Sequence, residues 1–315
     1  MALFPLATAD APSPWSSPWA KWKQVLVGAY RESSQDNAGL VAAGVAYYGF
    51  LAFVPLIAAT ILVFGLVADP RQLAGHLQSI AASLPADAAK LVNEQLASSV
   101  ATSSTKKGLG LLGAIAVALF GARNGAGAVI TALNIAYDET ETRGFLKLNL
   151  IALVMTIGTI LGGFAAAAAI TAVGVLERLL PFAPGPAIVV GQILTLAVVA
   201  LLAAGGAATL YRYAPSRPDA GWVWITPGSV FFAVVWLLIT WGFGLYVRSF
   251  GNYNATYGSI GAVVILITWF YLTSYALLLG AELNSEFEQK TPGGAKPKDP
   301  SGGERPPTDE PGARR

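Results

Sequence analysis

The stretch from Gly221 to Ala281, GWVWITPGSVFFAVVWLLITWGFGLYVRSFGNYNATYGSIGAVVILITWFYLTSYALLLGA, contains a single charged side chain, Arg248. A bilayer core about 30 Å thick is crossed by roughly 20 apolar residues in an α-helix. The stretch therefore has room for two spans joined by a short turn around Arg248. Its apolar residues do not alternate with polar ones, as the strands of a membrane barrel would, so both spans are predicted to be helices.

The same reasoning finds four more apolar stretches upstream, and it predicts six transmembrane helices. Their approximate ranges are 38–67, 108–137, 148–176, 187–211, 222–247 and 257–282. The composition agrees, because 54% of the residues are hydrophobic and only 12% are charged. Abundant Gly and Ala favour close helix packing in lipid. The sequence thus predicts an all-α polytopic membrane protein with one membrane domain over residues 38–288.

The segments around the spans have their own patterns. Residues 1–37 form a leader and an amphipathic helix, whose tryptophans Trp15, Trp19 and Trp22 recur at helical spacing, as in a helix lying at the membrane interface. The loop from 68 to 107 is predicted to form amphipathic helices on the outer face. Residues 289–315 are rich in Pro, Gly and charge, which is typical of a disordered tail. With six spans, 14 of the 20 Lys and Arg residues fall on the same side of the membrane as the two termini, which favours a cytoplasmic location for both termini.

The second predicted span contains a polar, glycine-rich segment around Arg123 and Asn124. Three glycines flank this pair: Gly121, Gly125 and Gly127. Such a segment can unwind to line a cavity, and an Arg inside a span is costly enough to favour an anionic partner. In the alternative interpretation, Arg123 reaches the inner headgroups or pairs with Glu139 or Glu141, and no substrate is involved.

Other polar or aromatic groups in the spans are hypothetical substrate contacts, with interhelical packing as the alternative. They are Asn134, Tyr47, Tyr48, Tyr257 and Tyr271. The hypothetical structural or gating positions outside the glycines near Arg123 are Pro55, Gly258, Gly261 and Glu282. The acidic run that starts at Glu282 and continues through Glu286 to Glu288 is expected to be solvated where the last helix leaves the membrane.

The sequence lacks the residues and motifs that most types of enzymatic catalysis require. There is no cysteine, the single histidine is His76 in the predicted outer loop, and neither a P-loop nor an H-E-x-x-H motif is present. We therefore expect no enzymatic activity, no cofactor, no metal and no nucleic-acid partner.

Three blocks of sequence resemble one known family. The first combines Ala46-Tyr47-Tyr48 with Val54-Pro55-Leu56, the second is Ala132-Leu133-Asn134-Ile135-Ala136-Tyr137, and the third runs from Tyr253 to Asn284. In this order and spacing, residues 20 to 288 resemble the BrkB/YihY family of bacterial inner-membrane proteins. The resemblance implies six spans with both termini inside, in the bacterial inner membrane. Some members are suspected of exporting or flipping lipids or lipopolysaccharide precursors, and the family was once labelled ribonuclease BN and virulence factor. No catalytic residues come with the resemblance.

Together these features predict a transporter, flippase or exporter of an amphipathic or lipid-like anionic substrate. The expected partners are membrane lipids, an unknown small amphipathic substrate and further copies of the chain. The alternative is a non-transporting scaffold, or an envelope-integrity or virulence-associated factor. A cavity that reaches the membrane midplane and contains Arg123 would favour transport, whereas a tightly packed bundle with a broad apolar outer patch would favour assembly.

Overall fold

The structure is a computed structural model that describes residues 15, 18–67, 120–121, 123–179, 185–217, 225–249 and 254–290. All regular elements in this part of the chain are helices, which confirms the all-α prediction. The labelled helices are α1 (Trp19–Gln35), α2 (Ala38–Val67), α6 (Phe145–Leu179), α7 (Gly185–Tyr213), α8 (Pro227–Ser249) and α9 (Asn254–Gln289). A further helix covers residues 123–136. The predicted outer loop 68–107 and tail beyond Lys290 lie outside the described residues.

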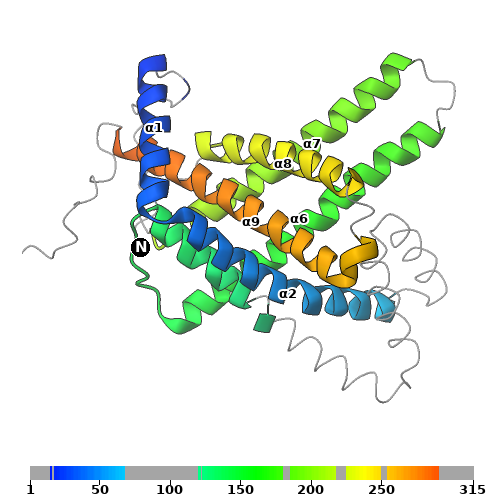
Figure 1. Ribbon diagram of the computed structural model, residues 1–315, viewed down its shortest axis with the longest axis horizontal. Helices are drawn as coiled ribbons and strands as arrows, with labels where there is room; N and C mark the ends of the chain where they lie inside the picture. The colour runs from blue at the N-terminus through cyan, green and yellow to red at the C-terminus, as the bar shows by residue number, and fades with distance from the viewer. Residues whose placement is uncertain are drawn as a thin grey trace, which may run out of the picture.

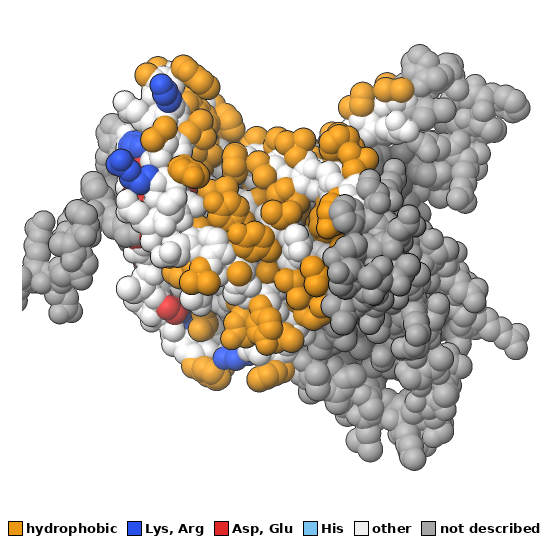
Figure 2. All heavy atoms as spheres, in the orientation of Figure 1, with side chains coloured by type: hydrophobic (Ala, Val, Ile, Leu, Met, Phe, Trp, Pro, Cys, Tyr) orange, Lys and Arg blue, Asp and Glu red, His pale blue; other side chains and the backbone are white. Residues whose placement is uncertain are grey.

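Four of the described helices are long and apolar enough to cross a membrane. The spans are Phe145–Ala166, Val189–Tyr213, Pro227–Tyr246 and Val263–Gln289, and Ala38–Phe53 is a shorter apolar segment. In the face shown in Figure 2, apolar side chains form broad patches over the described helices, and most of the visible Lys and Arg side chains lie at the α1 end. The membrane character of the chain is thus supported, while six spans and their orientation stay predictions.

Helix α9 lies at the centre of the helical assembly (Figure 1). It packs against α2 and α8 along its length and against α1 near its C-terminal end. Helix α7 joins the rest through α8 and also packs along α6. The helix over 123–136 lies beside α2, where Gly125 approaches Ala52 and the backbone of Tyr48.

One apolar core draws buried side chains from α2, the 123–136 helix, α6, α7, α8 and α9. A second, smaller cluster fastens α1 to α9 through Val25, Ala29, Leu283 and Phe287. Trp22 meets Phe287 edge to face at 4.6 Å between ring centroids. Of the predicted tryptophan stripe, Trp22 therefore packs on the protein, whereas Trp19 is exposed.

Helices α8 and α9 touch backbone to backbone at Gly228 and Gly280. A Cβ atom on Gly228 would overlap the carbonyl oxygen of Gly280, and one on Gly280 would overlap the hydroxyl of Tyr211. Small residues at such crossings let membrane helices approach closely. This contact fixes the N-terminal end of α8 against the last third of α9.

The last helix extends beyond the predicted boundary at residue 282, to Gln289. The sequence led us to expect its acidic run to be solvated, but only Glu288, with a side chain 45% exposed, is partly so. Glu282, Asn284 and Glu286 are only 2%, 5% and 6% exposed. The expectation was wrong for these three residues because α1, α8 and the segment after the 123–136 helix cover this end of α9.

Candidate functional site

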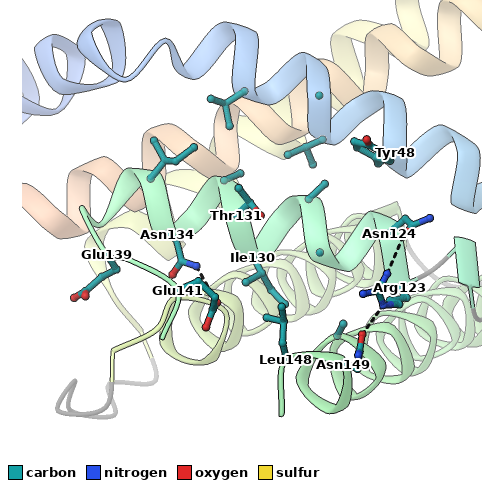
Figure 3. Close-up of a pocket in the computed structure, with 18 residues that line it drawn as sticks. Tyr48, Arg123, Asn124, Ile130, Thr131, Asn134, Glu139, Glu141, Leu148 and Asn149 are labelled. Atoms are coloured by element: carbon teal, nitrogen blue, oxygen red, sulfur yellow. Dashed lines mark hydrogen bonds between the residues drawn. The ribbon is translucent and has the colours of Figure 1, made fainter. Parts of the chain in front are cut away.

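A cavity of about 670 Å³ lies between α2, the 123–136 helix and the beginning of α6 (Figure 3). Its size is within the range of about 300–1,000 Å³ that is usual for small-molecule sites. Its lining is mainly apolar and includes Val41, Val45, Ile130, Ile135, Leu148 and Ala152, together with the hydroxyl residue Thr131. The charged and amide side chains lie at its two ends, as Figure 3 shows.

Arg123 lies at one end of this cavity, together with Asn124 and Asn149 (Figure 3). Its Nε donates a hydrogen bond to Oδ1 of Asn149, and its Nη1 donates one to Oδ1 of Asn124 at 3.3 Å. The guanidinium carbon also lies 5.5 Å from the ring centroid of Phe145. Phe145 and Asn149 are four residues apart at the start of α6, so one face of that helix holds the guanidinium.

The guanidinium keeps much of its hydrogen-bonding capacity. It has five N–H donors, and two of them are used by the asparagine side chains. The ion pairs recorded among the described residues involve Arg143, Arg217 and Lys290, and none includes Arg123. Arg123 is therefore a cation that is oriented by neutral amides and has no carboxylate partner within the part of the chain described.

Pairing of Arg123 with Glu141 is contradicted by the structure. Glu141 forms an ion pair with Arg143 at 2.6 Å and accepts a hydrogen bond from Nδ2 of Asn134 at 3.0 Å. The hydrogen bonds from Arg143 hold the pKa of Glu141 at about 2. Glu139 and Glu141 both lie at the cavity end opposite Arg123 (Figure 3), so neither glutamate pairs with it.

The backbone that follows Arg123 is helical. Residues 123–136 form one continuous helix that includes Gly125 and Gly127, so the predicted glycine break was wrong at these positions. A Cβ on Gly125 would lie 3.4 Å from the Cβ of Ala52, which indicates close packing against α2. A Cβ on Gly127 would meet no other atom within 4 Å, and this residue lines the cavity. Gly125 therefore allows α2 to approach closely, and Gly127 leaves open space in the cavity, while the backbone at both residues stays helical.

The opposite end of the cavity is formed where the 123–136 helix ends. Asp138 has a φ of 55°, and its N–H and that of Glu139 return to the carbonyl oxygens of Ile135 and Asn134. This left-handed residue with its two returning bonds is a Schellman termination. It turns the chain back across the cavity end, and Oδ1 of Asn134 accepts a hydrogen bond from the backbone N–H of Ser216 at 2.8 Å.

Asn284 connects three segments just beyond this end. Its Oδ1 accepts a hydrogen bond from the backbone N–H of Gly228 at 2.8 Å, and its Nδ2 donates to Oγ1 of Thr226 at 3.0 Å and to the hydroxyl of Tyr137 at 3.2 Å. Thr226 and Ser229 also bond reciprocally, side chain to backbone, at the start of α8. An α9 side chain thus completes the N-terminal cap of α8.

Arg217 extends this polar contact region. Its guanidinium carbon lies 3.9 Å from the ring centroid of Tyr137, and its Nη1 donates to Glu288 at 2.6 Å. We call Asn134, Tyr137, Arg217, Asn284 and Glu288 the polar junction. Asn134 and Tyr137 belong to the second block that carried the family resemblance, and Asn284 ends the third. The structure therefore brings two distant sequence blocks into contact.

The cavity brings together five of the candidate substrate-contact and gating residues: Arg123, Asn124, Asn134, Tyr48 and Gly127. Reasoning from sequence missed Asn149. The one feature that could have marked it as a site residue is its position as a lone amide near the start of an apolar stretch. Tyr47 is 54% exposed and meets Tyr48 edge to face, and Tyr271 stacks on Tyr275.

The remaining candidates lie elsewhere. Gly261 is buried in α9, Gly121 is helical, and Glu282 lines a separate small pocket beside Asp36. Pro55, Tyr257 and Gly258 lie within α2 and α9, but their side chains are outside the described residues.

Comparison with known proteins identifies the family of the chain. The family model described as Virulence factor BrkB matches residues 29–303. The putative ribonuclease-like protein YfkH of Bacillus subtilis is 33% identical over 174 residues, which are 54% of this chain and 63% of that protein. A UPF0761 membrane protein of Stenotrophomonas maltophilia is 40% identical over 76 residues, 24% of this chain and 18% of the relative.

The chain thus spans less than two thirds of the length of these relatives. No solved structure matches it. The family match covers most of the chain and includes both sequence blocks that meet at the polar junction. This chain belongs to the Virulence factor BrkB family.

Proposed function

We propose that this protein is an inner-membrane transporter, acting as a flippase or exporter of an amphipathic or lipid-like anionic substrate. The observation that carries the proposal is the position of Arg123 at one end of a cavity of about 670 Å³, where three of its five N–H donors are not used by the two asparagines. The substrate's anionic group would bind the guanidinium, and its apolar part would contact the cavity's middle section.

The energetics of Arg123 support an anionic ligand. A charged side chain near the centre of a membrane helix costs about 2.5–3.5 kcal/mol on insertion scales. The two asparagine oxygens satisfy part of its hydrogen-bonding capacity, but they carry no negative charge to compensate the guanidinium. A bound anion would supply that charge, and charge-assisted hydrogen bonds are the stronger kind.

The orientation of the proposed transporter follows the distribution of basic residues. With both termini in the cytoplasm, the cavity end at Glu139 and Glu141 faces the cytoplasm, and Arg123 lies deeper in the membrane. About 16 Å separates Asn134 from Arg123 along the helix axis, at ~1.5 Å per residue. Substrate entry from the cytoplasmic side is therefore part of the proposal. Since the sequence contains no ATPase motif, an ion or substrate gradient would drive the movement.

We further propose that the chain is not an enzyme. A ribonuclease requires a general acid and base, or metal-binding carboxylates, beside a basic surface that binds phosphates. The ionisable side chains among the described cavity residues are Arg123 and Tyr48, with Glu139 and Glu141 at the other end. The word ribonuclease-like in the name of YfkH belongs to that relative.

The test is transport in liposomes that contain the purified protein. Fluorescent phospholipids with several headgroups are incorporated, and their movement between leaflets is followed by dithionite quenching. The wild type should move at least one anionic lipid, Arg123→Ala should lose that activity, and Arg123→Lys should keep part of it because the positive charge remains.

The matched control is Arg31→Ala, which removes an arginine from the exposed surface of α1. It should transport as well as the wild type. Equal transport by wild type and Arg123→Ala, at equal reconstitution, would remove Arg123 from the mechanism. No movement of any lipid headgroup or of single-chain anions would instead favour the scaffold or envelope-integrity alternative.

A further inference from the structure

We infer that the cavity selects an elongated amphipath that carries one negative charge at its leading end and a neutral or cationic group at its trailing end. This inference rests on the proposed function and specifies its substrate class. It follows from three observations on the cavity: the distance between its ends, the side chains between them, and the charge at each end.

The two polar ends are too far apart to bind one small headgroup. Arg123 and Asn134 are separated by 11 residues of continuous helix, which corresponds to about 16 Å. Apart from Thr131, the side chains between them are mainly apolar, and they come from α2, the 123–136 helix and α6. A ligand that contacts both ends therefore needs a long apolar body.

The end of the cavity at Arg123 accepts one anion. Three N–H donors of Arg123 remain after its bonds to Asn149 and Asn124. Those two asparagines are positioning residues, because they hold the guanidinium in place through its Nε and Nη1. A carboxylate or a phosphate ester can bind the remaining donors in a bidentate manner.

The other end disfavours a second anion. Glu141 is neutralised by Arg143, but Glu139 takes part in none of the ion pairs recorded among the described residues. A ligand whose trailing end is also anionic would place that charge next to the Glu139 carboxylate. A trailing ammonium group would be attracted there, and a methyl or hydroxyl group would avoid the repulsion.

The experiment compares three probes with the same twelve-carbon chain. Dodecanoate has one anionic end, 12-aminododecanoate adds a trailing ammonium, and dodecanedioate adds a trailing carboxylate. Binding to the full chain in nanodiscs is measured by titration calorimetry at pH 7, and the heat of titrating empty nanodiscs is subtracted. We expect 12-aminododecanoate to bind best and dodecanedioate to bind roughly three- to tenfold more weakly than dodecanoate.

Two variants assign the effects to residues. Glu139→Gln should remove the difference between dodecanoate and dodecanedioate, because the repelling carboxylate is gone. Arg123→Ala should weaken all three probes by roughly ten- to a hundredfold. Arg31→Ala, on the exposed surface of α1, should bind like the wild type.

The possible failures are distinguishable. Equal binding of dodecanoate and dodecanedioate, with Arg123 still required, would overturn the inferred selectivity and leave the proposed transport function intact. Binding that is independent of Arg123 would overturn both. Absence of binding by any probe, in protein that still moves phospholipids in liposomes, would overturn the inference alone.

Discussion

Replacement of Asn284 by Ala should destabilise the protein by about 3 kcal/mol. The side chain is 5% exposed and makes three hydrogen bonds, to Gly228, Thr226 and Tyr137. A net hydrogen bond contributes about 0.5–1.5 kcal/mol, and a buried donor left without a partner costs about 1–3 kcal/mol. Alanine removes all three bonds and leaves the backbone N–H of Gly228 without its acceptor at the start of α8.

The assay is thermal unfolding in detergent, followed by tryptophan fluorescence. For a chain of this size, 1 kcal/mol corresponds to about 2–4 °C in Tm, so Asn284→Ala should lower Tm by about 6–12 °C. The control is Ser285→Ala, one residue along the same helix, where the recorded bond is a long contact of 3.5 Å with Gln289. A shift below about 2 °C for Asn284→Ala, or equal shifts for both variants, would refute the view that Asn284 holds α8, α9 and Tyr137 together.

Two further predictions concern stability. Gly228→Ala should lower the free energy of unfolding by more than about 3 kcal/mol and sharply reduce the folded yield, because the new Cβ would overlap the carbonyl of Gly280. The control Gly244→Ala, where a Cβ would meet no neighbour within 4 Å, should be nearly neutral, and similar yields of both variants would contradict the close crossing. The depressed pKa of Glu141, about 2 beside Arg143, means that its charged form stabilises the fold above pH 4.5 and that this contribution disappears as pH falls toward 2. Since Glu141 is exposed to solvent, this contribution to the free energy of unfolding is about 1 kcal/mol or less. A plot of Tm against pH should fall more steeply below pH 4.5 in the wild type than in Glu141→Gln, and parallel plots would contradict the stabilising role of the Glu141 charge.

The helical class and the positions of most helices followed directly from apolar length. Helix α2 spans Ala38–Val67, which are the predicted bounds. Helix α9 runs seven residues past the predicted end at 282, because hydropathy marks where apolar residues stop and not where a helix stops. Asn284, which is buried, and Glu288, which is half-buried, bind partners on other segments, which no local pattern reveals.

The candidate site was only partly predictable for the same reason. Arg123 and Asn124 were conspicuous as polar residues within an apolar stretch, and both line the cavity. Asn149 could be recognised as a partner only once the start of α6 was placed beside Arg123. The glycines near Arg123 were misread as a helix break because composition cannot distinguish a glycine that unwinds a helix from one that lets another helix approach.

The polar junction and the cavity share one residue, Asn134, and this joins stability to the proposed function. Its Oδ1 binds the backbone of Ser216 after α7, its Nδ2 binds Glu141, and the same side chain lines the cavity end opposite Arg123. Any movement that opens or closes that end must therefore lengthen bonds to the segments after α7 and after the 123–136 helix. Asn134 and Asn284, which both belong to the blocks that resemble the family, thus shape one end of the cavity, while Arg123, the proposed anion-binding group, lies about three helical turns from Asn134.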